Sequence, residues 1–414
     1  MTINNEHKKL NVPNLRFKEF QGEWEKCKVS DLLDFYSTNS LSWDKLEYGT
    51  NAIQNLHYGL IHVGLPTMID LSKDKLPNIT NGNTPKNYEL CQEGDIAFAD
   101  ASEDTNEVAK AVEFYKLNGK AVICGLHTIH GRDNHQKTVV GYKGYAFSSM
   151  AFHHQIRRIA QGTKIYSINS KNFSECYIGI PSKEEQKKIA TLLRLIDERI
   201  VTQNKIIDKL QSLIKGINQR VFMNNGINYK LGEISEIRSG YSGNQLLSKK
   251  GLKVSRIETI SGHKVNLERV GYVAPFESSE NYKLQVGDIL FSNINSVEYI
   301  GNTAFIDKDY DLYHGMNLLR LTPNNMVVIP FYLYLLLNTN RMLNRFKTVC
   351  NKAVSQASIN QTELGKTVVQ IPDINAQKQI CELYQALYDK LESEKYANSL
   401  FQKQKQYLLR QLFI

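Results

Sequence analysis

Paired cysteines and long apolar runs are both missing from this chain of 414 residues. Its six cysteines stand singly, with no C-x-x-C spacing among Cys27, Cys91, Cys124, Cys176, Cys350 and Cys381. That pattern predicts neither a zinc site nor a disulfide framework, and it indicates the reducing cytoplasm. The longest apolar run, residues 327–337, is about half as long as a membrane span. Because it contains Pro330, we expect a strand end followed by a buried helix with Pro330 in its first turn.

Motifs for binding phosphate or metal are missing as well. The tripeptide 365–367 resembles the end of a P-loop, but Asn360 stands where the partner glycine is required. We expect a turn there that enters the last strand of its module. His127, His130 and His135 lie close together without helical spacing or neighbouring cysteines, so a polar loop is favoured over a metal site.

Positive charge is in excess. The chain has 51 Lys and Arg against 42 Asp and Glu, a net charge of +9 and a pI near 9.0. This balance favours an acidic partner such as nucleic acid or an anionic surface, with an ordinary basic protein as the equal alternative. A hydrophobic content of 42% allows two cores of roughly 150 residues each.

The sequence repeats itself. Four marks recur 191 residues apart: 167–169 (Ser-Ile-Asn) at 358–360, 180–181 (Ile-Pro) at 371–372, 186–187 (Gln-Lys) at 377–378, and Ile189 at Ile380. A fifth mark is similar in both copies, because the long segments end alike in 219–222 and 410–413. A sixth mark, Gly-Asp-Ile-x-Phe, occupies 94–98 and 287–291. A duplicated unit of about half the chain therefore organises the protein. Between the marks the halves differ, which is typical of a frame built to recognise two different things.

The segment after Pro181 predicts a coiled-coil helix. Its apolar seam repeats at steps of four and three and is interrupted only by Gln203: Ile189, Leu193, Ile196, Ile200, Ile207, Leu210, Ile214, Ile217 and Val221. Ser182 and Glu185 form a capping box, and residues 224–226 (Asn-Asn-Gly) supply the stop. About 40 residues at 1.5 Å each make a rod of roughly 60 Å.

The C-terminal copy of this helix has a less regular seam. Its apolar positions are Ile380, Tyr384, Leu387, Leu391, Phe401, Leu408 and Leu412, with Glu394, Asn398 and Lys405 intruding. One seam cannot be buried by one helix alone, so we expect the two helices to pack antiparallel. The alternative is that each helix packs on its own module or on a second chain.

The two modules are predicted to be mixed α/β, or α+β. Short strands are expected at 59–63, 95–98, 120–123, 253–257 and 288–291. The expected order is a first module at 1–180, a long helix at 181–225, a second module at 226–371 and a second long helix at 372–414. Long polar stretches between the strands are typical of functional loops.

This arrangement resembles the specificity subunit of a type I restriction-modification system. The resemblance covers the whole chain and depends on the marks at 180–189 and 371–380, the preceding Ser-Ile-Asn and the Gly-Asp-Ile-x-Phe strand, in the same order in both halves. Two departures are that Ala376 stands where the first copy has Glu185 and that the second helix carries one extra residue after Ile380.

The resemblance implies two target recognition domains, each reading one half of a bipartite site in double-stranded DNA. The paired helices would act as a ruler for the gap between the half-sites. It also implies two methyltransferase subunits and two restriction and translocation subunits as partners. No Pro-Pro pair occurs, so the Asn/Asp-Pro-Pro-aromatic motif of an amino-methyltransferase is missing, and we expect a non-catalytic subunit without a cofactor or metal. The alternatives are a self-contained modification enzyme and a coiled-coil scaffold that binds only proteins.

DNA recognition requires cations for phosphates and paired donors or acceptors for base edges. Residues of these types gather in loops, and the predicted DNA contacts are Ser102, Asn106, Arg132, His135, Lys137, Lys164, Tyr241, Asn244, Lys249, Asn293, Asn295, Ser296, Lys352 and Gln356. For any one of them the alternative is an ordinary solvated loop residue. Tyr241 could stack on a base, although packing within a Gly/Ser turn is the more common role.

Overall fold

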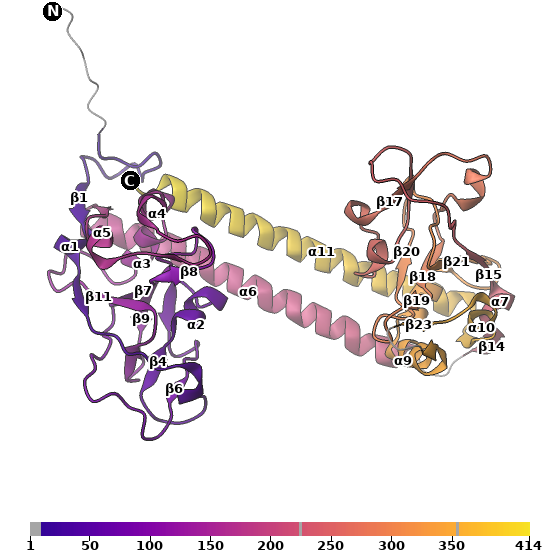
Figure 1. Ribbon diagram of the computed structural model, residues 1–414, viewed down its shortest axis with the longest axis horizontal. Coiled ribbons are helices and arrows are strands. Elements are labelled where there is room, and N and C mark those ends of the chain that lie inside the picture. Colours follow the sequence, from indigo (N-terminus) through magenta and orange to yellow (C-terminus); the bar gives the residue numbers. More distant parts are fainter. Residues whose placement is uncertain (1–9, 223–225, 353–355) are drawn as a thin grey trace, which may run out of the picture. The chain divides into compact units, whose positions relative to one another are not determined.

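The computed structural model describes residues 10–222, 226–352 and 356–414. They form two compact units, one of residues up to 205 together with 395–414, and one of residues 206–394 (Figure 1). Each unit therefore contains one α/β module and a part of both long helices. The predicted helix stop at Asn224 and Asn225, and residues 353–355 of a predicted DNA-contacting loop, lie outside the described residues.

The first unit is built around a five-stranded sheet in the order β2-β11-β7-β9-β5. Its strands are β2 (Asp34–Tyr36), β5 (Met68–Asp70), β7 (Ile96–Ala99), β9 (Ala111–Lys116) and β11 (Thr128–Arg132). All neighbours are antiparallel except β5 and β9. The Gly-Asp-Ile-x-Phe mark enters β7, a central strand that is buried throughout.

A second, four-stranded sheet in the first unit has the order β10-β4-β6-β3. Its strands are β3 (Leu46–Glu47), β4 (Gln54–Leu56), β6 (Asn78–Ile79) and β10 (Val122–Cys124), preceded by the 3-10 helix η1 (Trp43–Lys45). The strand predicted at 59–63 is wrong, because this segment forms helix α2 (Tyr58–Val63). The His57 side chain caps α2 by accepting a hydrogen bond from the Gly59 amide at 3.1 Å.

The remaining elements of the first module lie close to the long helices. They are β1 (Glu25–Lys28), α1 (Val29–Leu32), β8 (Ala101–Ser102), α3 (Lys143–Phe147), α4 (Met150–Ile159), β12 (Tyr166–Ser167), α5 (Ser170–Ser174) and β13 (Tyr177–Ile180). β1 pairs with β13, and β8 pairs with β12. One core cluster joins β7, α3, α4 and α5 to the long helices, with Phe98, Phe147 and Phe173 in edge-to-face contact. A second cluster fills the space between the two sheets.

The second unit repeats the central part of this plan. Its four-stranded sheet has the order β15-β21-β18-β20, with β15 (Ser235–Ser239), β18 (Ile289–Ser292), β20 (Thr303–Phe305) and β21 (Leu318–Pro323). Around it lie β14 (Ile227–Lys230), α7 (Leu231–Ile234), α8 (Pro330–Leu337), α9 (Asn340–Val349), β19 (Ile294–Asn295), β22 (Asn351–Lys352), β23 (Ala357–Ser358), α10 (Gln361–Gly365) and β24 (Val368–Ile371). As predicted, Pro330 occupies the first turn of a buried helix, but the strand end expected just before it is wrong, because β21 ends at Pro323. Gly365 ends α10, and the next two residues lead into β24.

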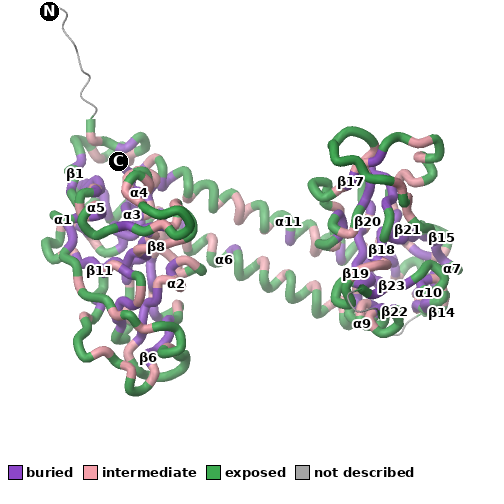
Figure 2. Tube along the Cα trace, in the orientation of Figure 1, coloured by how far each residue is buried: buried purple, intermediate pink, exposed green. Residues whose placement is uncertain are grey.

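The second unit differs between β15 and β18. This segment contains β16 (Leu252–Val254) and β17 (Gly271–Val273), which pair with each other, and the short 3-10 helices η2 (Ile257–Ile260), η3 (Leu267–Arg269) and η4 (Ser279–Tyr282). The predicted strand at 253–257 is therefore shorter and begins one residue earlier. In both units the buried residues gather around the sheets and along one side of the helix ends (Figure 2).

The two long helices are α6 (Lys183–Val221) and α11 (Ile374–Gln411), and they pair antiparallel as predicted. In the first unit Asp197 of α6 pairs with Lys405 at 2.6 Å, and Asn204 bonds to Asn398 at 2.9 Å. In the second unit Asn218 accepts a hydrogen bond from Tyr384 at 3.2 Å. Asn398 and Lys405, which interrupt the apolar seam, are therefore matched by polar partners on the facing helix. In the described part of the chain no helix is long and apolar enough to cross a membrane.

The predicted seam faces inward along both helices. Ile189, Leu193 and Ile196 are buried in the core of the first unit, and Leu391, Leu408 and Leu412 are buried as well. Tyr384 is buried in the second unit. The other predicted seam residues are partly exposed: Ile200, Ile207, Leu210, Ile214, Ile217, Val221, Ile380, Leu387 and Phe401. Burial is deepest where a module adds a third layer to the helix pair.

Candidate nucleic-acid interface

The duplicated glutamines join each long helix to its module. Gln186 Oε1 accepts from the Val139 amide at 2.9 Å, and its Nε2 donates to the Pro181 and Lys137 carbonyls. Gln377 makes the same three kinds of bond, accepting from the Ile329 amide at 2.8 Å and donating to two carbonyls. Both glutamines are completely buried. The repeated Gln-Lys mark is therefore a structural joint.

The duplicated aspartates anchor the central sheets. Asp95 accepts two hydrogen bonds from Arg132, at 2.9 and 2.8 Å, and one more links it to His130 at 2.7 Å. In the second unit Asp288 lies 4.0 Å from Arg320 and accepts from Thr322 at 2.6 Å. Both frames therefore contain a buried Asp–Arg pair, and the one in the first unit is more tightly bonded. The arginines differ in position, because Thr322 stands where the first unit has Arg132 and Arg320 stands where it has His130.

The Ser-Ile-Asn marks begin α5 and α10. Asn169 caps α5 by accepting from the Asn172 amide at 2.7 Å, and Asn360 caps α10 by accepting from the Glu363 amide at 2.8 Å. The strand before each cap, β12 or β23, is half of a two-residue ladder with β8 or β19. The marks therefore fix the base of a short hairpin-like feature in each unit.

In the first unit this feature brings three predicted DNA contacts together. Ser102 lies on β8 opposite Tyr166 of β12, and Lys164 lies in the exposed turn just before β12. Asn106 follows β8, and its amide oxygen accepts from Arg157 at 3.0 Å. We define the first hairpin as residues 101–106 together with 161–167. Amides, hydroxyls and cations are the kinds of group with which proteins contact base edges and phosphates.

The corresponding feature in the second unit is the three-stranded sheet β19-β23-β22, which we call the second hairpin. Asn295 pairs with Ala357, and Lys352 pairs with the same residue from the other side. The predicted contacts Asn293, Ser296 and Gln356 adjoin these strands. Lys352, Gln356 and Ser296 are exposed, whereas Asn293 and Asn295 are partly buried.

The Asn293 amide is of particular interest. Its Oδ1 atom is buried and has no hydrogen-bond partner among the described residues. Asn295 Nδ2 donates to the Ser292 hydroxyl at 3.0 Å, and its Oδ1 accepts from the Ser296 amide at 2.8 Å. These contacts fix the orientation of the Asn295 side chain. Both asparagines remain predicted DNA contacts.

Three predicted contacts of the first unit lie elsewhere. Arg132 is only 9% exposed, and its guanidinium bonds to Asp95, Glu89 and the Leu90 carbonyl. Arg132 therefore has a structural role, and its side chain points into the module instead of toward a DNA-binding surface. Lys137 pairs with Glu25 at 2.9 Å on the side of the module near β1. His135 is exposed in the same loop.

Three predicted contacts of the second unit lie between β15 and β16. Asn244 and Lys249 are exposed there. The Tyr241 ring stacks on Phe276 with a centroid distance of 4.0 Å and meets the edge of Tyr282. Packing is thus the observed role of Tyr241, although Asn244 and Lys249 stay predicted contacts.

The structure adds basic residues that the sequence reasoning missed. Arg157 and the exposed Arg158 form the last turn of α4, shortly before the turn that carries Lys164. Lys347 occupies the last turn of α9, shortly before Lys352. Cations at corresponding helix ends could have been found from the repeat, because residues 150–159 and 340–349 have the same strongly amphipathic pattern.

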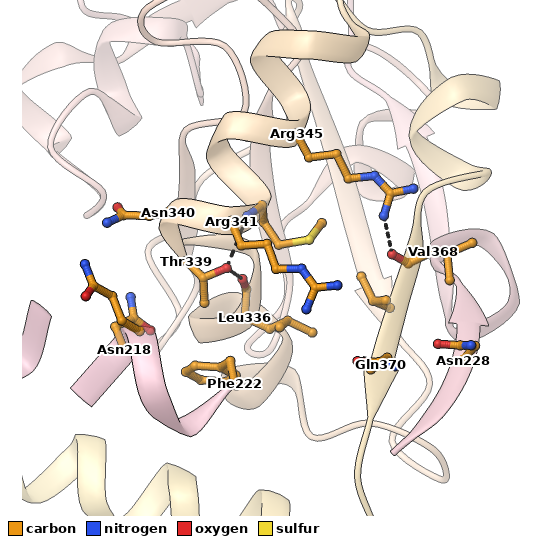
Figure 3. A pocket seen from close by; sticks show the side chains of 13 residues that line it. Asn218, Phe222, Asn228, Leu336, Thr339, Asn340, Arg341, Arg345, Val368 and Gln370 are labelled. Carbon is orange, nitrogen blue, oxygen red and sulfur yellow. Dashed lines mark hydrogen bonds between the residues drawn. The ribbon is translucent and has the colours of Figure 1, made fainter. Parts of the chain in front are cut away.

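Each unit also has a surface pocket at the end of a long helix. In the second unit it has a volume of ≈ 410 Å³ and lies between α9, β24 and the end of α6, with Phe222 at its base (Figure 3). Arg345 reaches across it to donate to the Val368 carbonyl at 2.7 Å. In the first unit the pocket of ≈ 680 Å³ lies between α4, β13 and the end of α11, with Phe413 in the place of Phe222.

Two units that share one frame and differ in their loops define a class of protein with an internal duplication. Comparison with known families identifies it further, because residues 75–212 and 226–399 each match the type I restriction modification DNA specificity domain. The chain belongs to this family and carries its domain twice.

Two relatives illustrate the range of similarity. A Methanocaldococcus jannaschii protein assigned as the type I restriction enzyme MjaX specificity subunit is 43% identical over 150 residues, which are 36% of this chain and 35% of that protein. The type I restriction enzyme EcoKI specificity subunit of Escherichia coli K12 is 25% identical over 278 residues, 60% of this chain and 58% of that protein. The matches therefore span about a third to three fifths of these relatives.

The fold is also that of solved specificity subunits. The S subunit of a type I restriction-modification system from M. genitalium aligns with a TM-score of 0.58 at 17% identity, covering 97% of this chain and 99% of that one. A chain from a structure on complex assembly and conformational transition of the type I R-M system aligns with a TM-score of 0.60 at 15% identity, covering 93% and 96%. At this level of identity the likeness concerns the fold.

Proposed function

We propose that this chain is the DNA-sequence-reading subunit of a type I restriction-modification complex, with one unit for each half of a bipartite site. The observation that carries the proposal is the contrast between matching frames and differing hairpins. At the same place in the strand ladder the first hairpin presents Ser102 and the second presents Asn295. Equivalent positions with different polar groups are suited to two different base sequences.

Non-specific affinity would come from the basic residues near the hairpins. Arg158, Lys164 and Lys352 are exposed and can neutralise phosphates, which releases counterions and makes binding depend on salt. The net charge of +9 adds a long-range attraction to DNA. Amide side chains such as Asn295 would then discriminate between bases at short range.

The chain itself is proposed to be non-catalytic and to act in the cytoplasm together with methyltransferase and restriction subunits. The paired pockets support two copies of one partner, because the same combination of helix end, strand and short helix occurs once in each unit. A partner that recognises Phe222 and its surroundings would find Phe413 in the equivalent place.

Titration of a labelled duplex library tests the proposal, first with the chain alone and then with its methyltransferase subunit. Lys164→Ala and Lys352→Ala should each weaken binding to all sequences and lower the slope of log K against log salt by about 1. Lys73→Ala is the matched control, since Lys73 is an exposed lysine in the turn after β5. Equal losses in all three variants would contradict a role for the hairpins.

Base discrimination is tested with Asn106→Ala and Asn295→Ala. Each should change preference at one half-site only, by about 1–3 kcal/mol per lost base contact. A change at both half-sites from one substitution would contradict the division of labour between the units. Methyl transfer to DNA by the isolated chain with S-adenosylmethionine would favour the alternative of a self-contained enzyme.

A further inference from the structure

Three side chains of metal-binding types, two of them six residues apart and the third more distant in sequence, meet in the core of the first unit. They are Cys91, Cys124 and His130, and one ligand atom from each lies within 4.8 Å of the others. The two sulfurs are 3.6 Å apart. All three residues are buried, with exposed fractions of 5%, 2% and 0%.

We propose that these three side chains bind a thiolate-preferring divalent cation of the Zn²⁺ type. Two sulfurs at 2.3 Å from a tetrahedral zinc ion are about 3.8 Å apart, close to the observed separation. Two cysteines and a histidine are a common donor set for zinc, and soft thiolates select such ions over Mg²⁺ or Ca²⁺.

The histidine is prepared for this role by its neighbours. Its Nε2 atom is 2.7 Å from Asp95 Oδ2, and Asp95 is held by two hydrogen bonds from Arg132. A carboxylate paired with arginine accepts, so Nε2 carries the proton and Nδ1 keeps its lone pair. Nδ1 is buried and has no hydrogen-bond partner among the described residues. A carboxylate that orients a ligating histidine is a recurrent feature of zinc sites.

Charge balance also suits a buried ion. Binding converts two thiols into thiolates and releases two protons, and the two negative charges cancel the 2+ charge of the ion. The imidazole stays neutral, and the Asp95–Arg132 pair is already balanced. The filled site is therefore neutral overall, which is the condition for burying charges at low cost.

The ion would join β10 and β11, which only residues 125–127 separate along the chain, to the more distant Cys91. Cys124 ends β10 of the four-stranded sheet, His130 lies in β11 of the five-stranded sheet, and Cys91 precedes β7. The bound cation would cross-link the two sheets next to the core cluster between them. The second unit has Arg320 at the place that His130 occupies in the first, because these residues pair with Leu290 and Ala97, the same position of the Gly-Asp-Ile-x-Phe mark.

Cobalt and zinc titrations of the full chain test the proposal, after treatment with a chelator and in a reductant that does not bind metal. We expect one Co²⁺ per chain, a sulfur-to-cobalt charge-transfer band, and displacement of the cobalt by Zn²⁺. Cys124→Ser and His130→Gln should each lower the affinity for the metal at least tenfold. Cys350→Ser, a buried cysteine of the second unit, should bind as the unchanged chain does.

A second measurement separates loss of the site from loss of the fold. Stoichiometric Zn²⁺ should raise the melting temperature of the unchanged chain and slow hydrogen exchange in β10 and β11, with no change in β18 and β21. In Cys124→Ser, checked for its circular dichroism spectrum, both effects of zinc should disappear. Three results would overturn the proposal. They are weak, non-stoichiometric metal binding, a charge-transfer band that remains in Cys124→Ser, and a Cys91–Cys124 disulfide that persists after treatment with the reductant.

Discussion

The first and second units share a frame and differ in what the frame carries. Strands β2-β11-β7-β9 of one have the same order as β15-β21-β18-β20 of the other. Between the first strand of this frame and its central strand, the first unit inserts β3, β4 and β6, which form a second sheet with the later strand β10. The second unit inserts β16, β17 and three short 3-10 helices there. The positions that are the same in both units, such as Gln186 and Gln377, join each module to its long helix. The loops can therefore differ without changing these contacts.

The largest expected difference between the units concerns the buried aspartates. Asp95→Asn should lower the free energy of unfolding of the first unit by about 3–5 kcal/mol, because it removes the buried one of the two carboxylates that pair with Arg132. Asp288→Asn should cost clearly less, since Arg320 lies 4.0 Å from Asp288 and also donates to the Lys283 and Asn281 carbonyls.

Tryptophan fluorescence can follow the first unit in isolation, because both tryptophans, Trp24 and Trp43, belong to it. Hydrogen exchange in β18 and β21 reports on the second. Chemical unfolding in the presence of a chelator gives the stability of the metal-free protein. If Asp288→Asn proved as costly as Asp95→Asn, the two Asp–Arg pairs would have to be regarded as energetically equal.

The glutamine joints should, by contrast, behave alike. Gln186→Leu and Gln377→Leu each leave one backbone amide and two carbonyls without their buried partner, at a cost of about 2–3 kcal/mol. Because the three bonds are the same in both units, the two losses should agree within about 1 kcal/mol. Urea unfolding of each variant measures this, and the exposed Lys187 and Lys378 offer matched Lys→Ala controls.

Features of the shared frame that depend on local sequence patterns could be predicted. The repeat and the seam predicted both long helices, since periodicity is local and the partner helix is in the same chain. The Ser182–Glu185 capping box was only half right. The Glu185 amide does bond to Ser182 at 3.3 Å, but its carboxylate binds Arg16. In the second copy Asp373 caps the helix instead.

Other features depend on contacts that no local pattern shows. Arg132 was predicted to face DNA from its polar neighbourhood, yet it lies on the same face of β11 as His130 and turns inward to Asp95, 37 residues away. The six cysteines gave no spacing signal, but the fold brings Cys91 and Cys124 together. Such distances are set by the pairing of strands. Strand pairing depends on tertiary packing, which local sequence patterns do not show.

Acid should affect the second unit through His314. Burial lowers the pKa of His314 to about 4, from an ordinary value near 6.5. The unfolded chain therefore binds this proton first, so stability present above pH 6.5 is lost as the pH falls toward 4. Between pH 7 and pH 5 the loss should be about 2 kcal/mol.

Hydrogen exchange in β18 and β21 at the two pH values, corrected for the intrinsic rate, measures this effect. His314→Gln keeps a donor for the Leu318 carbonyl, which the histidine bonds at 2.9 Å, but cannot titrate. The pH dependence of the second unit should shrink in this variant by that same amount. A dependence that persists unchanged would assign it to other groups.

The smallest expected effect tests whether the hairpin bases are equivalent. Asn169→Ala and Asn360→Ala each remove a helix cap, at about 1 kcal/mol of stability. Helix α5 stays held by α1 and α4, and α10 stays held by α7 and β15. Loss of the cap should therefore loosen the strand just before it, and so the adjoining hairpin, more than the rest of the module. Exchange should accelerate at β12 in one variant and at β23 in the other. Asn169→Asp and Asn360→Asp, which keep the capping oxygen, should restore protection, and acceleration spread evenly over the unit would show that the cap supports the whole module rather than the hairpin.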